Sequence, residues 1–204
     1  MFITIEGIEG SGKSTNAAFV IEYLNNIGIQ ALHTREPGGT LIAEKIRAIF
    51  LDQSLGEPIT CQTELLLMFA ARSQHLHNLI IPALDSGKYI VCERFTDASF
   101  AYQGGGRYIK QEYISFLENF VQCGLSPDLV LLFDVDVRIA LDRIKARSNI
   151  DRIEQEKADF FERVRAVYLH RAAAYPQKYY IIDANQDLIN VQKQINNILL
   201  KTIK

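Results

Sequence analysis

The chain has 204 residues, of which 48% are hydrophobic, and its formal net charge is −2. This length and hydrophobic content predict one domain, spanning residues 1–204, with a single core. A nearly neutral charge supplies no global basic field of the kind that binds nucleic acid or anionic membranes. Neither a signal peptide nor a membrane-spanning run is recognisable, and the three cysteines form no CxxC pair. We therefore expect a cytoplasmic protein with free thiols, and neither nucleic acid nor a membrane as partner.

Short apolar runs alternate with helical patterns along the chain. The runs predict strands buried on both faces of a parallel sheet, at residues 2–6, 29–34, 88–93, 129–134 and 179–183. Helical patterns occupy residues 14–27, 41–51, 60–86, 109–123, 137–146, 154–173 and 188–201. This alternation is typical of a doubly wound α/β domain. Ligands of such sheets bind beyond the carboxyl ends of the strands, so the loops that follow the strands should share one face.

A phosphate-binding pattern follows the first predicted strand. Residues 7–14, GIEGSGKS, match G-x-x-x-x-G-K-[ST] and open the first predicted helix. The glycines allow backbone N–H groups to point at phosphate oxygens, helped by the positive end of the helix. Lys13 would contact the β- and γ-phosphates, and the Ser14 hydroxyl would bind Mg²⁺. The predicted ATP site comprises Gly7, Glu9, Gly10, Ser11, Gly12, Lys13, Ser14 and Thr15.

A phosphate-binding loop alone leaves kinases, GTPases and ATPase motors open. The sequence has no Asn-Lys-x-Asp on a later strand, so guanine recognition of the GTPase kind lacks support. A small-molecule kinase needs a second pocket, positive charge at the transfer point and a means of excluding water.

The remaining segments resemble the thymidylate kinase family. TREPGGT at 34–40 is similar to the family's REPGGT stretch, and LMFAARSQH at 67–75 to its FAAR-x-QH helix. RFTD at 94–97 with AYQGGGR at 101–107 resembles its DR[YF]…AYQGGGR loop, and residues 147–156 look like the lid of the bacterial enzymes. The matches keep the family's order over roughly the first five-sixths of the chain.

This resemblance implies an activity and an architecture. The activity is phosphorylation of dTMP to dTDP with ATP and Mg²⁺, in dTTP biosynthesis. The implied fold is that of a P-loop kinase: an α/β domain with a five-stranded parallel sheet, order 2-3-1-4-5, and helices on both faces. A homodimer is implied as well.

Phe69 and Arg72 lie three residues apart on a predicted helix and therefore share a face. Taken alone, they indicate a core phenylalanine beside a solvated arginine. The resemblance implies instead that Phe69 stacks on thymine and that Arg72 hydrogen-bonds it.

The acceptor phosphate is expected at the end of the third strand. Arg94 can hold it bidentately there, and Arg47 resembles the family's second arginine on that phosphate, with a solvated helix face as the alternative. The other implied dTMP contacts are Glu9 (at the 3′-hydroxyl), Glu36, Ser99, Tyr102 and Gln103. Gly104, Gly105 and Gly106 would give this loop freedom to close.

Glu93 departs from the family, which typically has Asp at this position. A carboxylate there can hold Mg²⁺ through water or orient the acceptor, and we include it with Lys13, Arg94 and Arg152 in the predicted catalytic set. The extra methylene shifts the carboxylate by about an ångström, in a reaction where such displacements matter.

The segment at about 146–154 is predicted to be a lid. Because Lys13 is the one cation of the phosphate loop, the charge developing on the transferring phosphoryl group needs another partner. By position, Arg152 resembles the family's lid arginine that reaches this group, and Arg147 the one that stacks on adenine. Residues 183–186 lie where related kinases rest the adenine.

Two other interpretations stay open at this point. A UMP or CMP kinase would differ in the acceptor pocket, and the Phe69/Arg72 pair and the AYQGGGR loop argue against it. A nucleotide-binding switch without turnover would require dispensable lid arginines and an acceptor pocket with no occupant.

Overall fold

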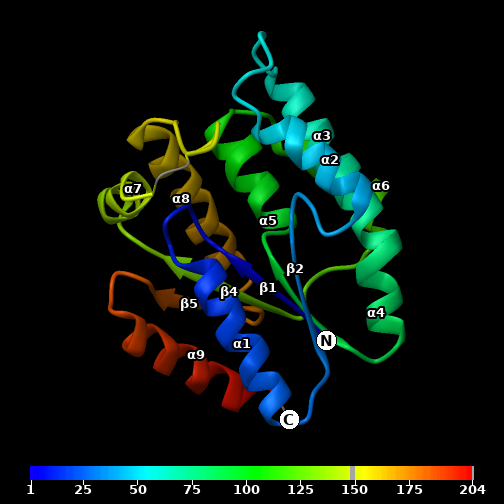
Figure 1. Ribbon diagram of the computed structural model, residues 1–204, viewed down its shortest axis with the longest axis vertical. Coiled ribbons are helices and arrows are strands. Elements are labelled where there is room, and N and C mark those ends of the chain that lie inside the picture. The colour runs from blue at the N-terminus through cyan, green and yellow to red at the C-terminus, as the bar shows by residue number, and fades with distance from the viewer. Residues whose placement is uncertain (148–149, 204) are drawn as a thin grey trace.

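The computed structural model of the protein, which describes residues 1–147 and 150–203, contains a five-stranded parallel sheet (Figure 1). The strand order is β2-β3-β1-β4-β5, which confirms the predicted order and the α/β class. The central strand β1 pairs through Ile3 with Val91 on one side and Leu129 on the other. The strands are β1 (Phe2–Glu6), β2 (Ala31–Arg35), β3 (Tyr89–Glu93), β4 (Leu129–Asp134) and β5 (Tyr179–Asp183).

The burial of strand residues depends on the position of the strand in the sheet. Every residue of β1 is buried, whereas the edge strands β2 and β5 each have one buried residue. An inner strand is covered by helices on both faces and by neighbours on both sides, so an uninterrupted apolar run suits it.

Helices cover both faces of the sheet, and Figure 1 shows α1 and α9 together on the viewer's side. The longer helices are α1 (Lys13–Asn26), α2 (Leu41–Leu51), α3 (Cys61–His75), α6 (Gln111–Gln122), α7 (Val137–Lys145), α8 (Ala158–Ala174) and α9 (Leu188–Thr202). The shorter helical segments are η1 (Leu76–Ile80), α4 (Ile81–Asp85), α5 (Thr96–Ser99) and η2 (Phe100–Gly106), of which η1 and η2 are π-helical. No helix within the described ranges is both long and apolar enough to cross a membrane.

The helix predicted at 60–86 is a continuous helical run interrupted by the π-helical segment η1. Pro82 lies just after η1, in the first turn of α4. Proline has no N–H to donate, and its ring clashes with the carbonyl four residues earlier in a regular helix. A wider π turn before Pro82 relieves that clash.

The loop predicted at 94–107 is helical from Thr96 to Gly106, and it packs against α8. A Cβ added to Gly105 would lie 2.6 Å from Val167 Cγ2, and one added to Gly106 would overlap the ring of Phe160. These two glycines therefore allow close packing of η2 on α8, and the freedom of residues 104–106 to close stays a prediction.

The helix predicted at 154–173 begins later, at Ala158. Asp151 accounts for the delay, because its Oδ1 accepts hydrogen bonds from the backbone N–H groups of Ile153 and Glu154, both at 2.9 Å. These bonds hold the chain in turns before α8 starts. Residues 148 and 149 of the predicted lid lie outside the described residues.

Candidate active site

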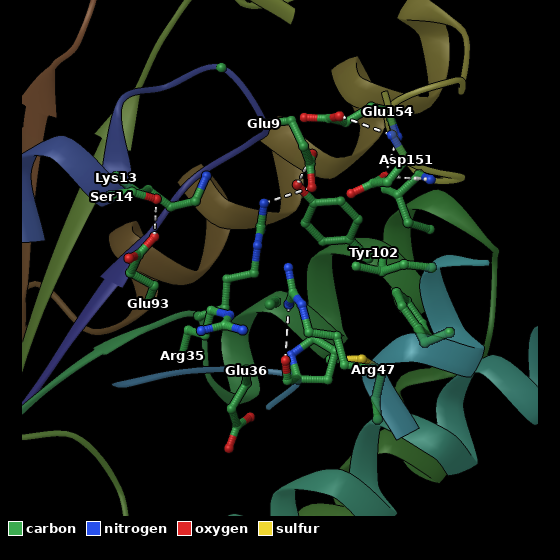
Figure 2. Close-up of a pocket in the computed structure, with 18 of the residues that line it drawn as sticks. Glu9, Lys13, Ser14, Arg35, Glu36, Arg47, Glu93, Tyr102, Asp151 and Glu154 are labelled. Atoms are coloured by element: carbon green, nitrogen blue, oxygen red, sulfur yellow. Dashed lines mark hydrogen bonds and ion pairs between the residues drawn. The ribbon is translucent and has the colours of Figure 1, made fainter. Parts of the chain in front are cut away.

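A cavity opens at the carboxyl edge of the sheet, where the loops after β1, β2 and β3 meet α2, η2, Arg147 and residues 151–154 (Figure 2). This arrangement agrees with the expected position of a ligand in a doubly wound sheet. Residues lining it from the phosphate loop and the strand ends are Glu9, Gly10, Gly12, Lys13, Ser14, Thr15, Arg35, Glu36, Pro37, Glu93 and Arg94. Those lining it from the helices and the lid are Arg47, Phe50, Leu51, Met68, Ala98, Tyr102, Gln103, Arg147, Asp151, Ile153 and Glu154.

The phosphate loop wraps closely around the start of α1. Gly10 and Gly12 have φ of 74° and 87°, a region open mainly to glycine, and a Cβ on Gly10 would overlap the carbonyl of Ala140. Lys13 is buried, and its Nζ donates to Ile8 O at 2.6 Å. Burial and the nearby Arg94 guanidinium lower the pKa of Lys13 to about 7. Among the described residues no carboxylate forms an ion pair with Lys13, which suits a lysine that binds phosphate.

Ser14 and Glu93 lie side by side in the cavity (Figure 2). Ser14 Oγ donates to Glu93 Oε2 at 2.6 Å, and His33 Nε2 lies 2.8 Å from Glu93 Oε1. Burial acts to raise the pKa of Glu93, but hydrogen bonds from His33 and Ser14 outweigh it and hold that pKa below its usual value. A hydroxyl and an ionised carboxylate are hard oxygen ligands of the kind that Mg²⁺ prefers, so this pair fits the predicted metal site.

Arg94 sits at the end of β3 with φ of 65°, unusual for a residue other than glycine. Its backbone N–H donates to Ile5 O at 2.9 Å, which fixes this conformation against β1. The guanidinium donates to Glu9 Oε1 at 2.6 Å and to Gly7 O at 3.1 Å, and it lies 4.8 Å from the centre of the Tyr102 ring. The Tyr102 hydroxyl donates to the other oxygen of Glu9. The structure thus brings Glu9, Arg94 and Tyr102 into one cluster.

Two further arginines line the same wall. Arg47 donates to Pro37 O at 2.9 Å, and burial followed by the charge of Arg35 lowers the pKa of Arg47. Arg35 pairs with Glu44 at 3.0 Å at the rim. With Arg94, these side chains offer positive charge to an anion bound between them, so the cavity position of Arg47 agrees with the phosphate-binding expectation rather than with a solvated helix face.

Phe69 and Arg72 lie behind this wall, in the interior. Arg72 is fully buried, which shows that the solvated-arginine alternative was wrong. Its Nε donates to Glu36 Oε2 at 2.7 Å, and its Nη2 donates to Ser99 Oγ at 3.1 Å. The guanidinium carbon lies 4.5 Å from the centre of the Phe69 ring. Among the described residues, Arg72 Nη1 has no hydrogen-bond partner. A buried donor of this kind is open to a ligand acceptor.

Gln103 lines the cavity from η2, and its amide is oriented from behind. Its Nε2 donates to Glu64 Oε1 at 2.9 Å. The amide oxygen is buried and has no partner within the described part of the chain.

The two lid arginines point to different places. Arg147 lines the cavity and pairs with Glu154 at 3.1 Å. Arg152 is absent from the residues that line the cavity, and it pairs with the buried carboxylate of Glu64 at 2.8 Å. The structure therefore brings Arg147, and not Arg152, to the cavity wall.

The 183–186 loop is tied to the phosphate loop by Arg143. Arg143 Nη1 donates to Gly10 O at 3.2 Å and to Ala184 O at 3.1 Å. Residues 183–186 do not line the cavity described above.

Sequence reasoning missed three groups of site residues: His33, the carboxylates Asp151 and Glu154, and Glu64. His33 is adjacent to Glu93 because β2 neighbours β3, so the strand order was the signal that could have found it. Asp151 and Glu154 have partners within the lid segment, at Ile153 and Arg147, but no motif marks them as site residues. The partners of Glu64 are distant in sequence.

Three comparisons with known proteins agree with one another. The family model described as thymidylate kinase matches residues 5–195. The thymidylate kinase of Ectopseudomonas mendocina (strain ymp) is 53% identical over 199 residues, covering 98% of this chain and 94% of that protein. The thymidylate kinase of Pseudomonas savastanoi pv. phaseolicola is 52% identical over the same shares of both chains. A crystal structure of thymidylate kinase from Ehrlichia chaffeensis is similar with a TM-score of 0.80 and 33% identity, covering 98% of each chain.

Proposed function

The chain belongs to the thymidylate kinase family, and we propose that its cavity transfers the γ-phosphoryl group of ATP to dTMP, giving ADP and dTDP for dTTP synthesis. The observation that carries the proposal is the meeting of three parts in one cavity: Lys13 in the phosphate loop, the Ser14–Glu93 pair and Arg94. No residue needs to form a covalent intermediate, because in-line phosphoryl transfer depends on positioning and on stabilising charge.

ATP binds along the phosphate loop. Residues 7–15 direct backbone N–H groups and the start of α1 at its phosphates, and Lys13 contacts the β- and γ-phosphates. Burial lowers the pKa of Lys13, and binding of the phosphates beside it favours its charged form. Arg147 approaches the phosphates from the lid side, because it is the lid arginine that lines the cavity.

Ser14 and Glu93 would hold Mg²⁺, through the hydroxyl oxygen and the carboxylate, directly or through water. A metal ion held by these two residues would supply positive charge that neutralises the charge developing on the phosphate oxygens. His33 holds one oxygen of Glu93, and the other oxygen accepts from Ser14, so the carboxylate stays beside the hydroxyl.

dTMP occupies the opposite side of the cavity. Arg94 holds its phosphate in a bidentate contact with help from Arg47, and Glu9 accepts from the 3′-hydroxyl. Arg72, stacked on Phe69, offers its free Nη1 to a carbonyl of the base. Glu36, Ser99, Tyr102 and Gln103 complete the acceptor side of the site.

The active protein is proposed to be a homodimer associated through α6. Tyr113, Phe116 and Phe120 of this helix are all more than half exposed. Residues three, four and seven apart share one face of a helix, so α6 presents an apolar stripe. Exposed apolar stripes of this kind mark association surfaces.

A reducing compartment such as the cytoplasm suits the three free cysteines.

The proposal is tested by Arg94→Ala, with Arg138→Ala on the exposed surface of α7 as the matched control. Loss of charge-assisted hydrogen bonds to the acceptor should raise KM for dTMP by about 10- to 100-fold, since such bonds contribute about 1.5–3 kcal/mol each. KM for ATP should rise less than KM for dTMP, because Arg94 contacts the phosphate loop only through Gly7 O and Glu9 among the described residues and is proposed to bind the acceptor directly. An unchanged KM for dTMP in a folded Arg94→Ala protein would remove Arg94 from the acceptor site.

A further inference from the structure

Glu64 is a buried carboxylate outside the cavity, in the first turn of α3. Its two oxygens take different partners. Oε1 accepts from Gln103 Nε2 at 2.9 Å and from Arg107 Nε at 3.2 Å, and Oε2 accepts from Arg152 Nη2 at 2.8 Å. One carboxylate therefore joins the acceptor-side segment η2 to the lid segment.

Further contacts strengthen this junction. Arg152 Nε donates to Phe50 O at 2.9 Å, and its guanidinium carbon lies 5.0 Å from the centre of the Phe50 ring. Arg107 also pairs with Glu156 at 2.6 Å. The ionic cluster thus contains two carboxylates and two guanidinium groups, so it is balanced in charge and connects α2, α3 and η2 to residues 152–156.

The cluster around Glu64 connects two walls of the cavity, one formed by the acceptor-side residues and one formed by the lid. Gln103 and Phe50 line it directly, and residues 151, 153 and 154, which flank or follow Arg152, line it from the lid. Neither wall can shift away from the other without separating Glu64 from one of its partners. Burial of an unpaired carboxylate is costly, so the cluster favours the arrangement in which both walls are docked.

We infer that Glu64 is a positioning residue for phosphoryl transfer: it docks the lid through Arg152 against the segment that carries the acceptor side of the site. This inference rests on the proposed function, because that proposal assigns Arg147 of the lid to the phosphates of ATP. It gives Arg152 a role behind the cavity, as the lid's anchor, rather than on the transferring group.

The test uses Glu64→Gln, Arg152→Gln and the double variant. Asp142→Asn is the control for removing one carboxylate from an ion pair, because Asp142 is exposed and pairs with Lys145 at 3.9 Å. Two quantities are measured: kcat with both substrates saturating, and hydrogen–deuterium exchange of peptides covering residues 150–157 in the free protein. The exchange measurement reports on docking and does not depend on activity.

Each single variant should lower kcat by about 10- to 100-fold, on the scale of a displacement of about an ångström in an active site. Exchange in 150–157 should become faster in both, and Asp142→Asn should match the wild type in both measurements. Since Glu64 acts through Arg152, the double variant should lose about as much as Glu64→Gln alone, not the product of the two losses.

A double variant whose loss equals that product, or unchanged exchange in 150–157 in either folded single variant, would overturn the inference. If Glu64→Gln fails to fold, Arg152→Gln decides by itself, because Glu64 then keeps Arg107 as a partner. A wild-type protein that does not phosphorylate dTMP would overturn the proposed function. The exchange data would still show whether the Glu64–Arg152 ion pair docks residues 150–157.

Discussion

At the scale of single residues, Glu6 shows how the phosphate loop and the acceptor side are held together. It ends β1, just before the phosphate loop, and it is completely buried. Its Oε1 accepts from the backbone N–H of Phe95 at 2.7 Å, and its Oε2 accepts from the Tyr168 hydroxyl at 2.9 Å. Glu6 therefore fixes the chain directly after Arg94, whose backbone conformation is strained. Burial, with the charge of Asp97 nearby, raises the pKa of Glu6 to about 8.

This raised pKa predicts a pH dependence of stability. The folded protein binds a proton at Glu6 more tightly than the unfolded chain, whose ordinary pKa is 4.5. The stabilising contribution is therefore fully present below pH 4.5 and is lost as the pH rises through about 8. Glu6→Gln removes this dependence. Between pH 5 and 8, the wild type should lose stability relative to the variant as the pH rises. The difference between their free energies of unfolding should change by up to about 1.4 kcal/mol per pH unit.

Urea unfolding of both proteins at several pH values measures this difference. Parallel stability curves for wild type and Glu6→Gln over this range would show that the proton is not bound at Glu6.

At the scale of elements, the sequence predicted the strands well because each is a short apolar run. The predicted bounds of β1, β4 and β5 are confirmed, and those of β2 and β3 differ by one or two residues. Local patterns did not predict that residues 96–106 are helical. Three successive glycines usually indicate a turn, and the packing of η2 on α8 is a contact between segments about 60 residues apart that no window contains.

Local sequence patterns also failed to predict those site contacts that join segments distant in the chain. The phosphate loop and Arg94 were predicted because a motif or a strand end marks them. The burial of Arg72 and the pairing of Arg152 with Glu64 depend on tertiary neighbours 36 and 88 residues away in sequence. Position in a lid-like segment could not distinguish Arg147 from Arg152.

Helix α6 carries a prediction at this scale. Glu substitutions at Phe116 and Phe120, which are 68% and 73% exposed, should place charges within the proposed dimer contact and shift the protein to the monomer. Ile189→Glu is the matched control, because Ile189 is 67% exposed on α9, far from α6 in Figure 1. Sedimentation velocity measures the masses. A double Phe→Glu variant that sediments like the wild type would exclude this face of α6 as the contact.

At the scale of the whole molecule, one cavity receives contributions from segments spread over residues 9 to 154. In the proposed function, ATP binds beside β1 and α1, and dTMP binds beside α2, α3, β3 and η2. Arg152 of the lid pairs with Glu64 of α3, on the dTMP side. This division explains why a change on one side should alter binding of one substrate more than the other. Selection among acceptors should therefore reside in Gln103 at the cavity wall and in Phe69 and Arg72, which are packed behind that wall.

The most direct measurement is a panel of acceptors, with dTMP, dUMP, UMP and CMP compared by kcat/KM under saturating ATP and Mg²⁺. We predict that dTMP is the best acceptor and that dUMP is weaker by about 1–3 kcal/mol, because it lacks the methyl group that an apolar pocket would bury. A kcat/KM for UMP or CMP above that for dTMP would contradict the account.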